Sequence, residues 1–218
     1  MALLMASGCS GEGSSVATTS APTNPSSAPV VGSSQSAFLE QYEGDGFEML
    51  LPSKWSVLTH SDADFGSMLE GTGEHSEALE QWVIAMFDQG ARLFAFDELS
   101  AHPGSFGNIN TNAQPGSIDN ISIIELPLPG LTVTEVESVT VQQVKDFWDA
   151  KDIESEIRTF PAGEAVIVYC GLPNTRNEGI TVRLLTDSTQ WVITLVAMDV
   201  GPLEEHFETM LDSFRETP

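Results

Sequence analysis

The residues best suited to hold a metal ion are concentrated in one polar stretch after the first strand signals. His60, Asp62 and Asp64 alternate with small residues, and two glutamates and a further histidine follow. Hard divalent cations take several oxygen ligands, so this spacing could form a cation site. However, Gly66 is displaced by one position from the glycine of a calcium-binding EF-hand loop, and the bidentate glutamate of the twelfth position is absent. A solvated loop is therefore the favoured interpretation, and a metal site the alternative.

The sequence contains none of the standard catalytic motifs. It has no G-x-S-x-G, no phosphate-binding Gly-Lys-Ser/Thr loop, no H-E-x-x-H and no C-x-x-C. The four histidines, at 60, 75, 102 and 206, are far apart, and His206 is expected to face solvent from a helix. We therefore expect no catalytic residues and no cofactor. The alternative is an exported hydrolase, or a ligand-binding enzyme, whose site is assembled from distant residues, as two converging carboxylates or a paired His would indicate.

Cys9 is the most informative residue for the cellular location of the protein. It follows a short apolar run and the small residues Ala6-Ser7-Gly8, which is typical of the lipobox where a bacterial signal peptidase leaves an acylated cysteine. The signal is incomplete, because no basic residue precedes Lys54 and Ala6 stands where the lipobox more often has Leu. Residues 1–9 are thus interpreted as a truncated lipoprotein signal peptide whose true start lies upstream. The alternative is a disordered tail with a chance cysteine.

Residues 10–37 resemble a tether between an anchor and a folded domain. Of these 28 residues, 22 are Ser, Thr, Ala, Gly or Pro, which cannot bury enough apolar surface to fold. As a flexible coil the segment would span about 30 Å. Residues 38–218 then form one domain, because about 180 residues build one core comfortably and two poorly. The sequence predicts a cell-membrane protein, lipid-anchored on the extracytoplasmic face.

The charge balance excludes two classes of partner. With 32 acidic and 8 basic residues the net charge is −24, which repels nucleic acid and anionic lipid headgroups. The expected membrane contact is therefore through the lipid anchor only, and the sequence does not identify the protein partner. The acidity suits a solvated shell in a salty environment, since the acids are spread along the domain. A site for cations or a basic partner is the alternative explanation.

Periodicity predicts three helices. Apolar stripes run through 79–87, 141–148 and 203–214, with Gly90 as a C-terminal cap of the first and Thr140 with Gln143 as a capping box of the second. The acidic start of the third helix and Arg215 at its end suit the helix dipole. The four tryptophans, at 55, 82, 148 and 191, fall on apolar faces and are assigned to the core.

Strand signals lie between and after these helices. They cover 46–57, interrupted by a turn at Pro52, and then 91–96, 107–111, 121–126, 164–170, 180–187 and 190–197. The last two are separated by a tight turn, which predicts an antiparallel hairpin. Cys170 ends an apolar run and is expected to be buried and inert. Strands without strict βα alternation predict an α+β fold, an antiparallel sheet sandwiched by helices.

Two segments resemble the PsbP/Mog1-like fold. The opening Gly46-Phe47…Pro52…Trp55 resembles its first hairpin, and the close resembles its last hairpin, ending Trp191-Val192-Ile193-Thr194-Leu195, with the terminal helix up to Arg215. Within that fold the chain is similar to bacterial lipoproteins, including the Lpq-type proteins of actinobacteria. The resemblance implies a sheet between helices and a role in binding or assembly, with no shared catalytic apparatus. The sequence thus indicates a non-catalytic, lipid-anchored module of the bacterial envelope.

Overall fold

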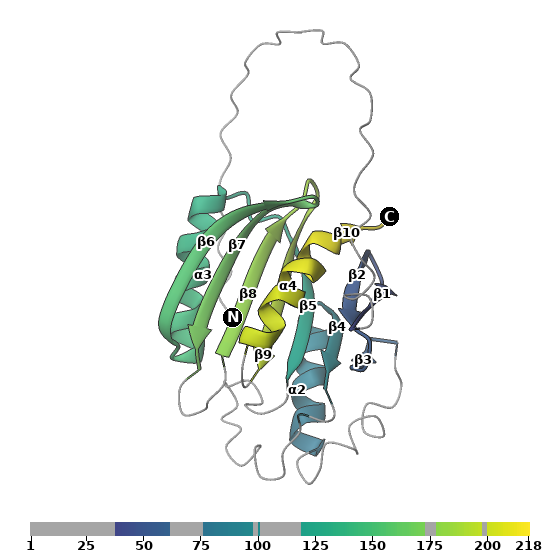
Figure 1. Cartoon of the computed structure of the whole chain (residues 1–218). Coiled ribbons are helices and arrows are strands. Elements are labelled where there is room, and N and C mark those ends of the chain that lie inside the picture. The colour runs from purple at the N-terminus through teal and green to yellow at the C-terminus, as the bar shows by residue number, and fades with distance from the viewer. Residues whose placement is uncertain (1–37, 62–75, 98–99, 101–118, 173–177, 198–199) are drawn as a thin grey trace, which may run out of the picture. The chain divides into compact units, whose positions relative to one another are not determined.

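The structure is a computed structural model that describes residues 38–61, 76–97, 100, 119–172, 178–197 and 200–218. In the described residues an α+β fold is formed by two antiparallel sheets and helices (Figure 1). The strands are β1 (Leu39–Glu43), β2 (Phe47–Pro52), β3 (Ser56–Leu58), β4 (Ala91–Phe96), β5 (Asn120–Pro127), β6 (Lys151–Phe160), β7 (Gly163–Gly171), β8 (Glu178–Leu185), β9 (Thr189–Ala197) and β10 (Arg215–Glu216). The helices are α2 (Ser76–Asp88), α3 (Val133–Trp148) and α4 (Gly201–Ser213). The predicted fold class is confirmed.

The larger sheet has seven strands in the order β3-β4-β5-β9-β8-β7-β6. Strands that neighbour each other in this sheet are antiparallel, and β8 and β9 form the predicted hairpin, with the amide of Thr186 donating to the carbonyl of Thr189 at 3.0 Å in the turn. The smaller sheet has the order β1-β2-β10. Its strand β10 follows α4 directly, so the end of the chain returns to the strand that opens the domain.

Successive residues of the central strands point to opposite faces of the large sheet, and each face has its own cover. One set, which includes Ile121 of β5, Ile193 of β9 and Val182 of β8, packs on α4 and on β2. On the other face, α2 packs on β3 and β4, while α3 packs on β7 (Figure 1). The sheet is thus a layer between two coverings, as the sequence predicted.

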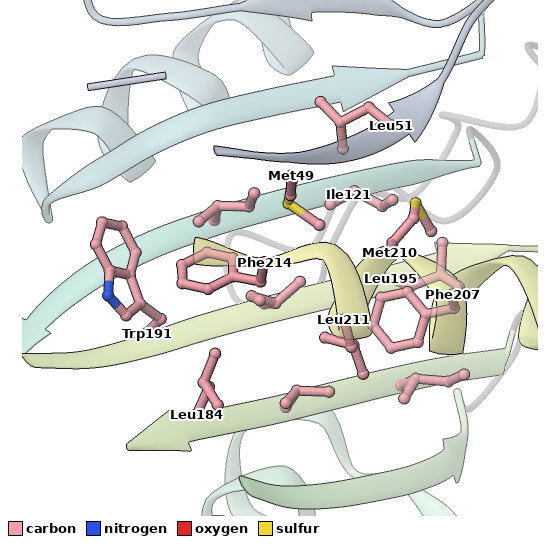
Figure 2. Close-up of a cluster of buried hydrophobic side chains, with 14 of the residues drawn as sticks. Met49, Leu51, Ile121, Leu184, Trp191, Leu195, Phe207, Met210, Leu211 and Phe214 are labelled. Carbon is pink, nitrogen blue, oxygen red and sulfur yellow. The ribbon is translucent and has the colours of Figure 1, made fainter. Parts of the chain in front are cut away.

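The face below α4 carries the largest apolar cluster (Figure 2). Phe47, Trp191 and Phe214 meet there with ring centroids 5.4–5.8 Å apart, and each is at most 1% exposed. Aromatic rings at these separations contribute stabilisation beyond the area they bury. The three rings come from β2, β9 and the end of α4, so they join the small sheet, the large sheet and the last helix.

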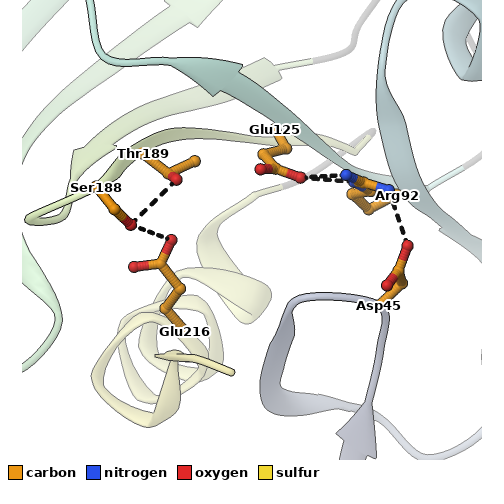
Figure 3. Close-up of polar contacts among 6 residues, drawn as sticks. All are labelled: Asp45, Arg92, Glu125, Ser188, Thr189 and Glu216. Carbon is orange, nitrogen blue, oxygen red and sulfur yellow. Dashed lines mark hydrogen bonds and ion pairs between the residues drawn. The ribbon is translucent and has the colours of Figure 1, made fainter. Parts of the chain in front are cut away.

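Two polar contacts join the small sheet to the large one (Figure 3). Arg92 of β4 donates to Glu125 of β5 and, at 2.8 Å, to Asp45 in the turn between β1 and β2. Ser188 in the β8–β9 turn donates to the carboxylate of Glu216 at 2.9 Å. Both contacts lie at the surface, where such pairs contribute little to stability and mainly fix orientation.

The helix ends confirm two predicted signals and correct one. Gly90 follows α2 with φ +99°, a conformation that favours glycine, and Arg215 donates to the carbonyl of Asp212 at the end of α4. The start of α3 was predicted too late. Its capping box is formed by Thr132 and Glu135, and Thr140 instead lies within the helix, where its hydroxyl donates to the Val136 carbonyl. The prediction was wrong because it began the apolar stripe at Val141, whereas Val133 and Val136 in the first turn also pack in the α3 cluster.

The opening strands are also paired differently from the prediction. The expected hairpin on either side of Pro52 does not form, because β2 pairs with β1 and β10 whereas β3 pairs with β4 in the other sheet. The turn at Pro52 therefore carries the chain from one sheet to the other. The strands β1, β6 and β10 were missed, since β6 is rich in charged residues and β10 is two residues long. The predicted strand 107–111 lies outside the described residues.

Candidate functional site

Most of the site residues proposed from the sequence lie outside the described residues. This is the case for Cys9, Asp62 and Asp64, so their roles stay predictions. His60 is described: it is exposed, and its ring lies edge-on to Phe87 at 6.2 Å. In the described ranges, no three His, Cys, Asp or Glu side chains are grouped so as to hold a metal ion.

Two other expectations have clear outcomes. Cys170 of β7 is 5% exposed, and burial raises the pKa of its thiol to about 11, against a smaller opposing effect of a backbone hydrogen bond with Gly179. The predicted burial of this cysteine is confirmed, and its low reactivity stays a prediction. His206 does not stand free in solvent as expected. It is half-buried and stacks on Phe38 with ring centroids 4.4 Å apart.

A groove lies between α2 and α3, over the middle of the large sheet. Both helices cover the same face of the sheet, α2 over β3 and β4 and α3 over β7. The strands β5, β9 and β8 lie between them (Figure 1). A cavity of about 480 Å³ results, which is within the range of small-molecule sites. We call it the interhelical groove. It is lined by Trp82, Ala85, Met86, Gln89, Ser122, Ile124, Gln143, Val144, Phe147, Trp148, Thr181, Arg183, Val192 and Thr194.

A row of hydroxyl groups forms part of the groove floor. Ser122 of β5 pairs with Thr194 of β9, which pairs with Thr181 of β8, so the three lie side by side across the strands. All three are at most 5% exposed, and the hydroxyls of Thr181 and Thr194 are 3.5 Å apart. Each neighbours apolar residues that point to the opposite face. Hydroxyls can both donate and accept, so this row offers adaptable hydrogen bonds to a bound molecule.

Arg183 stands beside the hydroxyl row, two residues after Thr181 on β8. Its Nη2 donates to the Oε1 of Gln143 at 2.8 Å, and its Nε is buried without a hydrogen-bond partner among the described residues. Burial lowers the pKa of this guanidinium to about 10 because the charged form loses hydration. By contrast, Arg92 is paired with Asp45 and Glu125.

Aromatic side chains from both helices form the walls. Trp82 of α2 is half-buried and lies edge-on to Phe94 at 5.4 Å, and Trp148 of α3 is half-buried as well. Phe147 is 68% exposed, although it is next to Trp148. The prediction that all four tryptophans belong to the core is thus only partly right. Trp191 is 1% exposed, but Trp82 and Trp148 border an open cavity.

One feature of the sequence could have indicated this groove. Ser122, Thr181, Arg183 and Thr194 interrupt strands that are otherwise apolar. In a sheet covered on both faces such residues need partners, and a cation is the most costly of them to bury. The signal alone does not show that the four side chains meet, because that depends on the strand order β5-β9-β8.

A second cavity, of about 740 Å³, is bordered by β6, β7, β8 and the start of α4, and carboxylates dominate its lining. Glu156 accepts from Tyr169 at 3.1 Å and from Arg158 at 2.9 Å, and Glu178 accepts from the amide of Val200 at 3.2 Å. Burial, and then the hydrogen bond with Glu156, raise the pKa of Tyr169 to about 12. The described lining contains no histidine. Through these hydrogen bonds and ion pairs, Glu156 joins β6 to β7, and Glu178 joins β8 to the residue before α4.

Comparison with known proteins identifies the fold. No family model matches the sequence, and no curated protein matches it. A solved structure of the cyanobacterial PsbP (CyanoP) of Synechocystis matches with a TM-score of 0.51 and 16% identity, covering 88% of this chain and 98% of that one. The crystal structure of LpqN, involved in cell envelope biogenesis of Mycobacterium tuberculosis, matches with a TM-score of 0.42 and 11% identity, covering 84% and 94%. Over the described residues, no helix combines the length and apolar character that crossing a membrane requires. The chain has a PsbP-like α+β fold.

Proposed function

We propose that this chain is a non-catalytic binding protein, lipid-anchored on the extracytoplasmic face of a bacterial membrane, and that the interhelical groove is its ligand site. The observation that carries the proposal is Arg183. Arg183 is half-buried, and its buried Nε has no hydrogen-bond partner in the described residues, which costs free energy in the unliganded protein. A site that binds a ligand accounts for this cost, since the ligand would supply the missing partner.

The shape and lining of the groove support the proposal. Small-molecule sites are concave and mostly apolar, with a few polar groups that fix orientation. The groove has that composition: aromatic rings on two helices, a row of hydroxyls and one cation on the floor. These groups are on helices and strands, which hold a site more rigidly than loops do.

The proposed location depends on the N-terminal sequence. Small residues before Cys9 and the tether of residues 10–37 are the features expected of a lipidated protein that reaches away from its membrane. The anchor can be tested by labelling bacteria that express the chain, with its native upstream sequence, with radioactive palmitate. We expect the label in the wild type and its loss in Cys9→Ala. An unlabelled wild type would contradict the anchor without touching the groove.

Binding at the groove can be tested by NMR with a mixed library of small molecules. The reporters are the indole N–H groups of Trp82 and Trp148 and the side-chain amide of Gln143, with Trp191 as an internal control in the other core. We expect at least one compound class to shift the groove reporters in a saturable way and to leave Trp191 unchanged. If none of the classes does so at millimolar concentration, the groove is not a ligand site.

The hydrolase alternative remains, and the acidic cavity between β6, β7, β8 and α4 is the feature that favours it, because Glu154 and Glu204 both line it. The test is a panel of ester, amide and glycoside substrates, with the double variant Glu154→Gln/Glu204→Gln as the control. Turnover by the wild type that the double variant loses would favour the enzyme. Equal rates in both would exclude this pair as the catalytic carboxylates.

A further inference from the structure

We propose that the ligand of the interhelical groove is an organic monocarboxylate with a flat apolar body, its carboxylate held by Arg183. This inference rests on the proposed function, because it names the chemical class that the same site would bind. Three properties of the groove carry it: the sign of its charge, the number of its charges and the nature of its walls.

The sign follows from the lining. Of the described residues that line the groove, none is acidic, although the chain has 32 acidic residues in its sequence. Arg183 is the one charged residue in that lining, and the neighbouring groups are neutral hydroxyls and amides. A cationic ligand would be repelled by the guanidinium, and a neutral one would leave the half-buried cation without an opposite charge. An anion would replace the hydration that the guanidinium lost on burial.

The number of charges favours a carboxylate over a phosphate. The guanidinium offers a planar fork of N–H donors that fits the two oxygens of a carboxylate, and only one donor is used by Gln143 among the described residues. A phosphate monoester carries close to two negative charges at neutral pH. One guanidinium in a protein of net charge −24 would neutralise only half of that charge. A single carboxylate matches the cation one to one.

The walls determine the body of the ligand. Trp82 and Trp148 face the groove from two different helices, and Phe147 stands at its exposed rim. The ring of Trp82 is supported from the sheet side by Phe94, so it presents a fixed surface. Flat apolar molecules gain most from such surfaces, since stacking adds to the burial of area. Thr181 lies two residues before Arg183 on β8, and Thr194 and Ser122 continue its row across β9 and β5. These hydroxyls can donate to or accept from a polar edge of a ligand that extends along the groove floor.

A matched series of small probes tests the inference on the full chain. Phenylacetate, phenylacetamide, phenethylamine and phenyl phosphate share a ring and differ in the charge of the head. With uniformly nitrogen-15-labelled protein, the Gln143 amide and the Trp82 and Trp148 indoles report binding. We expect phenylacetate to bind at least about tenfold more tightly than the amide, as loss of a charge-assisted hydrogen bond predicts. The amine should not bind.

Two variants assign the effect to the guanidinium. Arg183→Gln should weaken phenylacetate binding by about tenfold or more, whereas Arg215→Gln, which removes the same charge at the exposed end of α4, should leave it unchanged. Arg183→Lys keeps the charge without the planar fork and should give an intermediate affinity, which also serves if the glutamine variant fails to fold. Equal binding of carboxylate and amide, tighter binding of phenyl phosphate, or full binding by Arg183→Gln would each overturn the inference while leaving the groove a ligand site. If none of the four probes shifts the groove reporters, the inference fails together with the groove as a binding site for this skeleton.

Discussion

The two faces of the large sheet are built from alternate residues of the same strands, yet they differ in what they bury. Under α4, Ile193 and its neighbours on β5 and β8 join a cluster of apolar side chains (Figure 2). One residue further along, Thr194 belongs to a row of hydroxyls with a guanidinium beside it. Because the α4 face carries the largest apolar cluster and the other face two smaller ones, we expect the α4 face to provide more of the stability. The middle of the other face can then carry polar groups.

Arg92 and Arg183 show the same difference between a structural residue and a binding-site residue. Arg92 is on β4, the second strand of the large sheet, where Asp45 and Glu125 pair with it, and the contact with Asp45 ties the two sheets together (Figure 3). Arg183 is on the inner strand β8 with a neutral amide as its described side-chain partner. The first has the contacts of a structural residue. The second lacks them, which is why we place it in a binding site.

The largest expected effect is on the α4 face. Phe214→Ala would remove a ring that is fully buried between Phe47 and Trp191, and we expect a loss of about 3–5 kcal/mol in the free energy of unfolding. Phe147→Ala on the groove rim should cost less than about 1 kcal/mol, because that ring is mostly exposed. Urea unfolding followed by fluorescence measures both. Similar losses in the two variants would contradict the division of roles between the faces.

A pair of neighbouring substitutions sharpens the comparison on one strand. Ile193→Thr would put a hydroxyl into the apolar cluster and is expected to cost about 2–4 kcal/mol. Thr194→Val removes a hydroxyl whose described contact, with Thr181, is long at 3.5 Å, so a change within about 1 kcal/mol is expected. The midpoint of chemical unfolding gives both values. A larger loss in Thr194→Val than in Ile193→Thr would show that the hydroxyl row is structural.

The reactivity of the Cys170 thiol reports whether solvent reaches the sheet beneath α3. Because burial raises its pKa to about 11, the folded chain keeps the thiol protonated at pH values where the unfolded chain, with a pKa near 8.5, has lost the proton. Stability from this group is therefore present at neutral pH and lost as the pH rises from about 9 to 11. In the Cys9→Ala variant, where Cys170 is the remaining cysteine, we expect slow reaction with a thiol reagent at pH 8 that becomes fast in denaturant. Fast labelling of the native protein would show that this part of the face is open.

The smallest expected difference between the faces is in their response to salt. Repulsion among the 32 acidic residues opposes folding of the whole domain, and screening relieves it, so the unfolding temperature should rise as NaCl increases from millimolar towards molar. Ile193→Thr and Phe147→Ala should show the same slope as the wild type, because neither substitution changes a charge. A flat or falling temperature would indicate that the carboxylates are paired locally.

The sequence predicted the elements with a strong apolar period and missed those that are defined by their partners. The stripe of α2, the β8–β9 hairpin and the central strand β5 were found because alternate or helical spacing marks a buried face. The edge strand β6 was missed because its charges hide the period, and the hairpin expected at Pro52 was wrong because pairing depends on distant strands. The interhelical groove was missed for the same reason: Ser122, Thr194 and Thr181 become neighbours only through the strand order.

The most direct test of the account is the stability of Arg183→Met compared with Arg92→Met. If Arg183 is kept for a ligand, replacing it with an apolar side chain of similar length should leave the unfolding temperature of the ligand-free protein unchanged or raise it, since a half-buried, poorly paired charge is removed. Arg92→Met loses two surface ion pairs and should lower that temperature slightly. Scanning calorimetry of the wild type and both variants measures this. A fall in Arg183→Met as large as that in Arg92→Met would contradict the central claim, because Arg183 would then be part of what holds the fold together.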